Sequence, residues 1–399
     1  MRSLGIAVLA MAVLVFAWSP VAAQDASPAW SSADVSKLKQ WVAAAPQDAL
    51  PHIPTTELDR ALAGGDAEKI SAEARKIALR LAKMHLKGRA SSAERQGWNI
   101  RDTDDEDSLG RMLDGALSGG ALDTFFAMQR PAHADYSALR AAYGREADEQ
   151  RRGVIARNME RWRWLPRSLG DDYVLVNAAR FEAYLWRGGV QAGTWRVIVG
   201  KTSTPTPVFD TRIEGVILNP WWEIPASIVR ESVGALVRRN PSLARSRGYV
   251  WSGGRYRQRP GPNNALGQMK LVMPNPFSVF MHDTPNKTLF EEDVRAFSHG
   301  CIRTGEALDY AATLLEGVRT REEVERIVAS AETTRIDLAK PLPLYVAYFT
   351  AVDDGKGGIA ILDDIYGRDR RIKALADGRA SKAQFAAFGC DTKTGAQVW

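Results

Sequence analysis

The chain has 399 residues and a formal net charge of +6, and it is long enough for two or three compact domains. Its Lys and Arg residues are scattered, and no zinc-finger or basic-helix pattern occurs, so we expect no nucleic-acid partner. With two cysteines, the core of the protein must hold together without a disulfide framework.

Residues 1–23 have the pattern of a secretory signal peptide. Arg2 precedes an apolar run from Leu4 to Ala17, and small residues follow at Ala22 and Ala23. This run is shorter than the roughly 20 residues that a membrane-spanning helix needs. We therefore expect residues 1–23 to direct export and the mature chain to lie outside the cytoplasm.

Residues 24–150 predict an all-helical N-terminal scaffold domain. In "SSADVSKLKQWVAAA", apolar residues recur at helical spacing after a Ser cap. The histidines of this region, His52, His85 and His133, match no ligand spacing. A charged connecting helix is expected over 151–170, ending before Pro166, because the residue before a proline disfavours the helical conformation.

Residues 171–370 predict a β-rich domain. Short β-branched and aromatic runs alternate with turn residues, including Gly188 and Gly189, which is the pattern of a hairpin. Helices are expected from about Gly305 to Glu316 and after the capping box of Thr320 and Glu323. The fold class is thus α+β with mostly antiparallel strands. A partly helical insertion of about 223–262 interrupts the domain, and 371–399 is a C-terminal tail.

The segment "HDTPNKTLFEEDVRAFSHGCIR" places two of the five histidines near Cys301. A lone thiol in an exported protein is open to oxidation, so Cys301 is better explained by reactivity than by packing. Because a helix is expected to follow, its positive end would lower the thiol pKa. Gly300 allows a tight turn whose backbone N–H groups could stabilise an oxyanion.

A cysteine nucleophile also needs a proton carrier. His282 ends the strand-like run "FSVFMHD" and is the preferred candidate, while His299 competes for the role or orients its neighbours. Two alternatives stay open: Cys301 as a small buried hydrophobic residue, and a zinc site built from His282, His299 and Cys301. That spacing matches no standard zinc pattern, so we expect no metal and no cofactor.

The pattern H-x15-S-H-G-C, from His282 to Cys301, resembles the signature of the L,D-transpeptidases with a YkuD-type catalytic domain. The stretches "NPWWEIPASI", "NNALGQMK", "RAFSHGCIR", "NMERWRWLP" and "DIYGRD" are similar to the larger periplasmic, YcbB-like branch of that family. No upstream peptidoglycan-binding repeat is recognisable. The resemblance implies a periplasmic protein and a capping role for the insertion at 223–262.

The resemblance also implies a reaction. Cys301 would attack a peptidoglycan tetrapeptide stem, release D-alanine and leave a thioester, which the amine of a second stem would resolve into a 3-3 cross-link. The implied partners are donor and acceptor stems, with other cell-wall synthesis proteins as further candidates and carbapenems as covalent inhibitors. Six further residues are assigned roles: His282 as proton donor and acceptor, His299 as auxiliary, Gly300 as oxyanion-hole backbone, Ser298 in support of the turn, and Arg303 and Trp222 in substrate binding.

Two other functions remain compatible with these residues. Water in place of the second amine would give an L,D-carboxypeptidase or amidase, because the choice of acceptor depends on the shape of the cleft. A non-catalytic wall-binding protein is the third reading, although retention of both His282 and Cys301 argues against it. Arg303 could equally serve as a structural ion-pair partner.

Overall fold

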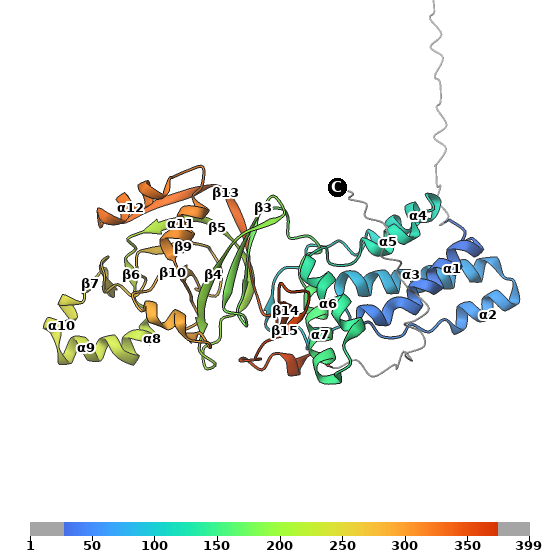
Figure 1. The fold of residues 1–399 in the computed structure, drawn as a ribbon, viewed down its shortest axis with the longest axis horizontal. Helices are drawn as coiled ribbons and strands as arrows, with labels where there is room; N and C mark the ends of the chain where they lie inside the picture. Colours follow the sequence, from blue (N-terminus) through green and yellow to red (C-terminus); the bar gives the residue numbers. More distant parts are fainter. Residues whose placement is uncertain (1–27, 374–399) are drawn as a thin grey trace, which may run out of the picture.

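The computed structural model describes residues 28–373 and has a mixed α+β fold (Figure 1). Helices lie at one end of an elongated molecule, a large sheet lies in the middle, and the insertion lies at the other end. The predicted fold class is confirmed. The expected signal peptide and Cys390 lie outside the described residues. Within residues 28–373, no helix is both long and apolar enough to cross a bilayer.

The N-terminal helices bury a core of their own, to which Leu38, Leu81 and Phe126 contribute. Ser31 caps the first helix through a capping box with Asp34, as the sequence predicts. The elements of this helical end are α1 (Ser32–Ala44), η1 (Ala45–Asp48), α2 (Thr56–Gly64), α3 (Ala67–Lys87), α4 (Leu109–Ser118) and α5 (Leu122–Ala127).

The next two helices, α6 (Ala134–Arg145) and α7 (Glu149–Trp162), belong to the core of the β domain. Leu139 and Met159 are fully buried there against the strands. The sequence assigned α6 to the helical scaffold and α7 to a connecting helix, because periodicity reveals an apolar face but not its partner. By its packing, the β domain begins before residue 150.

One large sheet has the order β1-β5-β13-β2-β3-β4-β12-β10-β9, and it closes on itself because β9 also pairs with β5. Six of its pairs are antiparallel, and four are parallel: β1–β5, β13–β2, β10–β12 and β11–β4. The sheet begins with the short strand β1 (Trp98–Asn99). Its longer strands are β2 (Tyr173–Asn177), β3 (Glu182–Arg187), β4 (Val190–Gly200), β5 (Val208–Leu218) and β13 (Thr334–Ala347).

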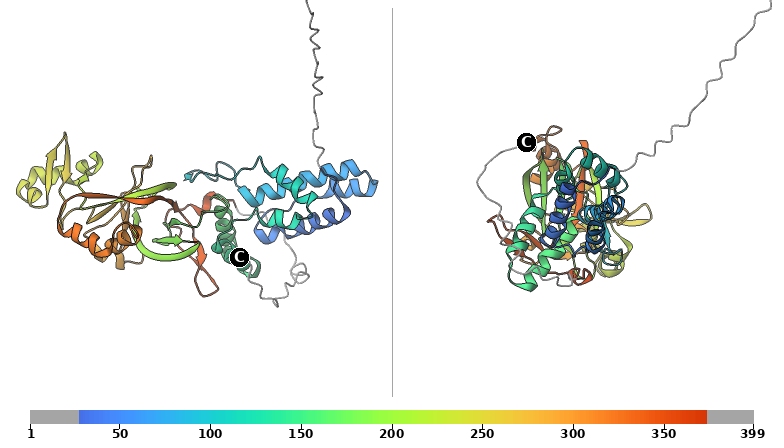
Figure 2. Two further views of the ribbon diagram at one scale, coloured as in Figure 1. Left: turned by 90° about the horizontal axis from the view of Figure 1, so that it is seen from above. Right: turned by 90° about the vertical axis from the view of Figure 1, so that its right-hand side faces the viewer.

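Figure 2 shows the sheet from above, with α11 and α12 against it. The predicted capping box of Thr320 and Glu323 starts α12, and Gly188 and Gly189 both have positive φ in the β3–β4 hairpin. The elements that complete this part are η3 (Lys287–Glu291), α11 (Ala307–Leu314), α12 (Arg321–Ala329), β14 (Ala351–Asp353), β15 (Ile359–Ile361) and η4 (Asp369–Arg371).

The strands nearest Cys301 are short: β9 (Met269–Val272), β10 (Met281–His282), β11 (Ala296–Ser298) and β12 (Ile302–Thr304). The run "FSVFMHD" was expected to be a strand throughout, but only its Met281 and His282 pair. Asn275 explains the difference. Its side-chain oxygen accepts from the N–H groups of Phe277 and Val279, and these bonds fold the start of the run into a turn.

The insertion, residues 223–262, is called the cap. Its strands form a separate sheet of order β6-β8-β7. Asn264 holds the two ends of the cap together, because its side-chain amide donates to the carbonyls of Pro220 (2.9 Å) and Arg259 (3.0 Å). The elements are β6 (Trp222–Glu223), α8 (Ala226–Ile228), the π-helix η2 (Val229–Val233), α9 (Gly234–Arg239), α10 (Pro241–Ser246), β7 (Tyr249–Ser252) and β8 (Arg255–Gln258).

Candidate active site

Two neighbouring strands bring His282 beside Cys301. Strand β12 begins directly after Cys301 and runs parallel to β10, so that Met281 lies opposite Ile302 and His282 lies opposite Arg303. The backbone of Phe280, just before β10, hydrogen-bonds the Cys301 thiol. A long connection separates His282 from Cys301 in the sequence. The parallel pairing of β10 with β12 nevertheless brings the histidine strand next to the cysteine turn.

Cys301 is partly buried and is not disulfide-bonded. The expected helix does not follow it directly, because β12 comes first and α11 begins only at Ala307. The prediction of a thiol acidified by a helix terminus is therefore wrong. Instead, burial raises the pKa of Cys301, and the Phe280 hydrogen bond and the charges of Lys270 and Arg303 counteract that rise.

His282 is buried, with 6% of its surface exposed. Burial lowers its pKa to about 3, so the imidazole is neutral at pH 7. Its Nδ1 atom contacts the carbonyl oxygen of Asp283. Since a carbonyl oxygen only accepts, the proton must sit on Nδ1, and Nε2 keeps a free lone pair. This tautomer can take a proton from a thiol.

The turn before Cys301 is organised by Ser298. Its hydroxyl accepts from the Gly300 N–H (3.0 Å) and donates to the Cys301 carbonyl (2.5 Å). Gly300 has a φ of +109°, a conformation that residues with a Cβ rarely adopt. The Gly300 carbonyl accepts from the hydroxyl of Thr206 (2.9 Å), so hydrogen bonds fix the turn from both sides.

These bonds change the expectation for an oxyanion hole. The Gly300 N–H was predicted to stabilise an oxyanion, but it already donates to Ser298 Oγ and is not free in this geometry. The next amide, that of Cys301, makes no hydrogen bond to any of the described residues. It is therefore the turn amide that remains available to a developing oxyanion.

A second layer of contacts reaches the turn from the C-terminal segment. The Tyr366 hydroxyl donates to the Gly200 carbonyl (2.6 Å), and the Gly200 N–H donates to Thr206 Oγ1 (2.9 Å). Asp369 forms an ion pair with Arg161 of α7 at 2.6 Å. The stretches "NMERWRWLP" and "DIYGRD" thus meet behind the loop that supports the cysteine turn.

Two cations lie close enough to Cys301 to affect its thiol. Arg303 is half-buried on β12, and Lys270 lies opposite His282 on β9 with its ammonium 4.1 Å from the centre of the Phe280 ring. Neither forms an ion pair within residues 28–373, and burial lowers the pKa of both. The alternative of Arg303 as a structural ion-pair partner finds no carboxylate here. Lys270 was not assigned a role from the sequence, although it ends the family-like stretch "NNALGQMK".

His299 points toward the cap rather than toward His282. Its Nε2 lies 2.9 Å from a carboxylate oxygen of Glu231, which belongs to the π-helix η2. Isolated π-helical turns are often found at functional sites. The auxiliary histidine therefore connects the cysteine turn to the cap.

Trp222, predicted to bind substrate, is half-exposed in β6 at the base of the cap, where it pairs with Gln258. Its neighbour Trp221 stacks on the guanidinium of Arg257, with 4.7 Å between the Arg257 Cζ atom and the ring centre. The tryptophan pair thus lies at the stem by which the cap joins the sheet. A role of Trp222 in binding remains a prediction.

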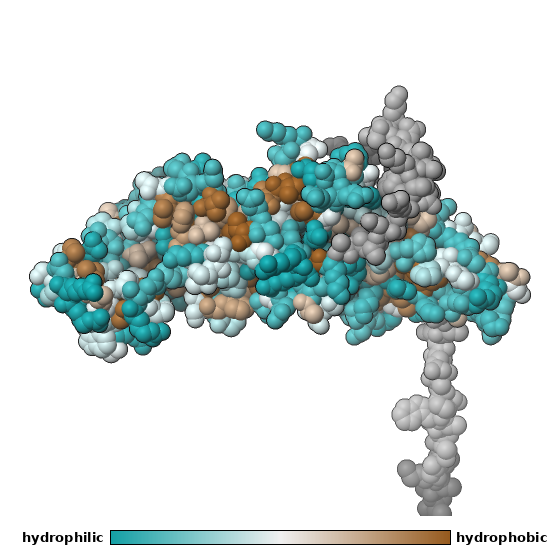
Figure 3. Space-filling model, turned by 90° about the horizontal axis from the view of Figure 1, so that it is seen from below, coloured by the Kyte–Doolittle hydropathy of each residue, from teal (hydrophilic) through white to brown (hydrophobic). Residues whose placement is uncertain are grey.

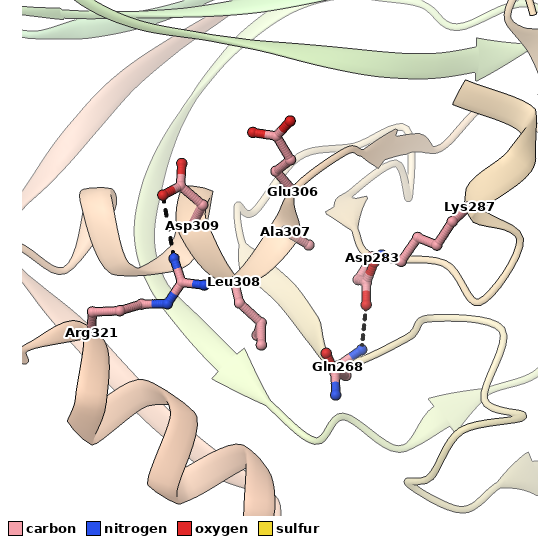
Figure 4. Close-up of a pocket in the computed structure, with 8 residues that line it drawn as sticks. All are labelled: Gln268, Asp283, Lys287, Glu306, Ala307, Leu308, Asp309 and Arg321. Carbon is pink, nitrogen blue, oxygen red and sulfur yellow. Dashed lines mark hydrogen bonds and ion pairs between the residues drawn. The ribbon is translucent and has the colours of Figure 1, made fainter. Parts of the chain in front are cut away.

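A cavity of about 360 Å³ opens beside the histidine strand (Figure 4). Asp283 lies on its wall, where its carboxylate accepts from the Gln268 N–H at 2.9 Å and contacts Lys287. Asp309 and Arg321 form an ion pair on the other side. Cys301 and His282 are not among the lining residues, so this cavity adjoins the site without containing its reactive groups. Within residues 28–373, no cluster of three or more His, Cys, Asp or Glu side chains could hold a metal ion.

Comparisons with known proteins show similarity to L,D-transpeptidases. The model of the L,D-transpeptidase catalytic domain, YkuD, matches residues 171–325. A curated Haemophilus influenzae protein that carries an L,D-transpeptidase name is 30% identical over 240 residues, which cover 55% of this chain and 48% of the relative. The chain therefore spans about half the length of that relative.

Solved structures include an L,D-transpeptidase from Mycobacterium smegmatis, 12% identical, with 44% of this chain and 58% of that chain covered and a TM-score of 0.27. Another is L,D-transpeptidase 3 from Mycobacterium tuberculosis in complex with a faropenem-derived adduct, 14% identical, with 44% and 60% covered and a TM-score of 0.24. Among these similarities, the sequence match is the specific one: residues 171–325 match the model of the L,D-transpeptidase catalytic domain, YkuD.

Proposed function

We propose that the protein forms 3-3 cross-links in peptidoglycan through a thioester on Cys301. The observation that carries this proposal is the pairing of β10 with β12, which sets a neutral His282 beside the buried thiol of Cys301. The match of residues 171–325 to the model of the L,D-transpeptidase catalytic domain supports peptidoglycan as the substrate.

In the first step, the Cys301 sulfur attacks the carbonyl of the third residue of a tetrapeptide stem, and His282 Nε2 takes the thiol proton. The Cys301 N–H, with Lys270 and Arg303 nearby, stabilises the negative charge that develops. The C–N bond to D-alanine then breaks, and His282 returns its proton to the leaving amine. A thioester on Cys301 and free D-alanine result.

In the second step, the side-chain amine of another stem attacks the thioester carbon. His282 takes a proton from that amine, the C–S bond breaks, and the departing sulfur recovers the proton. One peptide bond is broken and one is formed, so the exchange needs no external energy source. Exclusion of water from the site favours the amine over hydrolysis, and the cap is the element best placed to exclude it.

We further propose that the chain acts in the periplasm. The support is the pattern of residues 1–23 together with a substrate class found outside the cytoplasm. Carbapenems would acylate Cys301 in the place of the stem peptide, which gives a probe for the reactive thiol.

Intact-mass analysis after incubation with a carbapenem tests the proposal. We expect one adduct, which peptide mapping assigns to Cys301, and cross-linked 3-3 dimers when disaccharide tetrapeptides are supplied. Cys301→Ala should abolish both, whereas Cys390→Ala, the matched control, should retain both. His282→Gln should slow acylation by about 10²- to 10⁴-fold, the usual contribution of a general base. Absence of an adduct would contradict the thiol mechanism, and tripeptide monomers in place of dimers would indicate a carboxypeptidase.

A further inference from the structure

The net charge of the chain is concentrated in the cap. Residues 223–262 contain eight arginines, two glutamates and no Lys, Asp or His, which gives them a formal net charge of +6 at pH 7. The whole chain also has a net charge of +6. The cap therefore carries a charge equal to that of the complete protein, and the remaining residues are electrically balanced.

Both acidic side chains of the cap are already paired. Glu223 binds Arg257 at 2.6 Å, with Arg255 at 3.8 Å, and Glu231 binds His299 at 2.9 Å. Arg230 is exposed and has no ion-pair partner within the described part of the chain. Most arginines of the cap therefore have no acidic partner within the cap, and the cap presents a positive charge to solvent.

A groove of about 520 Å³ lies on the cap between the π-helix and the β7–β8 hairpin. It is lined by apolar residues that include Ile224 and Val229, by two arginines, Arg230 and Arg255, and by one carboxylate, Glu223, which binds Arg257 more closely than Arg255. Trp251 is 64% exposed and meets Tyr256, which also lines the groove, edge to face, with 4.8 Å between the ring centres. Figure 3 shows this end of the molecule as mostly hydrophilic with small hydrophobic areas between. Tryptophan, tyrosine and arginine are the residues that dominate binding surfaces.

We propose that this groove docks the anionic stem peptides of the substrate polymer before they reach Cys301, an inference that rests on the proposed function. A segment with free carboxylates and small apolar side chains meets both demands of the groove: arginines for the carboxylates and apolar lining residues for the side chains. A tetrapeptide stem that carries alanines and a diamino acid has this chemistry.

The position of the cap gives the docking a consequence for the reaction. Glu231 on the π-helix contacts His299 of the cysteine turn. A stem peptide that is bound to the cap is therefore kept near Cys301. Charge of one sign around a groove raises the local concentration of an oppositely charged ligand, and salt weakens this effect. Docking should therefore appear in KM and in its dependence on ionic strength rather than in kcat.

The test measures cross-linking kinetics on disaccharide tetrapeptide at several salt concentrations with the mature chain. For the double variant Arg230→Glu and Arg255→Glu, we expect KM to rise roughly tenfold at low salt, with kcat within twofold and a weaker salt dependence. The double lysine variant at these positions should restore KM, because it restores the charge. Trp251→Ala should raise KM while the salt dependence stays as in the wild type.

Arg111→Glu is the matched control, since Arg111 is exposed on α4 at the helical end of the molecule and its reversal changes the net charge by the same amount per site. If the double glutamate variant has the same KM and the same salt dependence as the wild type, the docking role is overturned. Loss of binding to anionic phospholipid vesicles with an unchanged KM would also overturn it and would assign the surface to a membrane. Carbapenem acylation of Cys301 separates the two failures: normal acylation with an unchanged KM removes only the docking, whereas absent acylation removes the proposed function itself.

Discussion

At the scale of single residues, the two groups that the proposed mechanism uses are both neutral. Burial raises the pKa of Cys301 and lowers that of His282 to about 3, so the proposed mechanism requires proton transfer between them to accompany attack on the substrate. Lys270 and Arg303 favour the thiolate of Cys301, but burial is the larger effect and keeps the pKa of the thiol above its usual value. The neutral pair limits oxidation of the thiol while no substrate is bound, because the thiolate is the reactive form.

The charges of Lys270 and Arg303 should set how far the thiol pKa rises. Removing either positive charge disfavours the thiolate, so Lys270→Met and Arg303→Met should each shift the pH dependence of Cys301 alkylation to higher pH than in the wild type. Iodoacetamide labelling followed by peptide mass mapping measures the Cys301 rate separately from that of Cys390.

Lys340→Met provides the control. Lys340 is an exposed residue of β13, and its substitution also removes one positive charge. An alkylation profile that coincides in the wild type and in the Lys270 and Arg303 variants would show that these cations do not act on the thiol.

The sequence predicted part of this site for a physical reason. Cys301, His299, Gly300 and Ser298 are consecutive or nearly so, and turn chemistry is local, so their proximity could be read directly. His282 could be added because a strand end offers a side chain to a turn. Lys270 could not, since its position beside His282 depends on the antiparallel pairing of β9 with β10. The shift of the thiol pKa was predicted with the wrong sign, because burial raises the pKa and β12 separates Cys301 from the start of α11.

At the scale of elements, short strands carry the chemistry and longer parts hold them in place. Strand β10 has two residues, and it keeps its position because β9 and β12 pair on either side of it. Its brevity could not be read from "FSVFMHD", whose composition suits a longer strand. The side-chain hydrogen bonds of Asn275 decided the outcome.

The C-terminal segment after β15 should matter for catalysis because Tyr366 supports the loop behind the cysteine turn. Tyr366→Phe removes a hydroxyl that donates to the Gly200 carbonyl and accepts from the Thr206 N–H at 3.3 Å. We expect kcat for cross-linking to fall several-fold while the ring still packs against Tyr348. The net cost of one hydrogen bond is about 0.5–1.5 kcal/mol, so the protein should remain folded.

Cross-linking kinetics and a urea titration on the same samples measure the two quantities for Tyr366→Phe. Tyr184→Phe is a suitable comparison, because the Tyr184 hydroxyl bonds Glu182 on β3, away from the turn. A kcat of Tyr366→Phe equal to that of Tyr184→Phe would argue against the supporting role.

At the scale of the whole molecule, buried histidines make stability depend on acidity. Burial lowers the pKa of His85 to about 3 and that of His133 to about 4, as it lowers that of His282 to about 3. In the unfolded chain these groups bind a proton below about pH 6.5. Between about pH 6.5 and the folded pKa values, the unfolded state therefore holds more protons, and the free energy of unfolding falls as the pH falls.

His85→Phe isolates one of these contributions, since neither ring nitrogen of His85 has a hydrogen-bond partner in the described residues. The loss of stability between pH 6.5 and 4 should become smaller by up to about 1.4 kcal/mol per pH unit. Urea unfolding at several pH values gives the slope. His52→Phe, at an exposed position, should leave the slope as in the wild type. An unchanged slope in His85→Phe would show that His85 titrates alike in both states.

The fold class could be predicted because hydrophobic periodicity distinguishes the helical end from the strand-rich part. The division between the two could not, because the apolar faces of α6 and α7 are compatible with either core. Which core they join depends on the strands that offer a complementary surface, and strand order is a long-range property. The pairing of β5 with β9, which closes the sheet, is also a long-range contact that local sequence patterns do not reveal.

The stem of the cap has a consequence for how such a catalytic domain can vary. One side chain, Asn264, fastens the beginning and the end of the cap, and the cap has its own sheet. Within the cap, changes away from Glu231, which contacts His299, and away from Arg259, which Asn264 binds, should therefore leave the closed sheet as it is. If the proposed function and the docking role of the cap hold, the same Cys301 and His282 could act on stem peptides of different composition through a change in the cap alone.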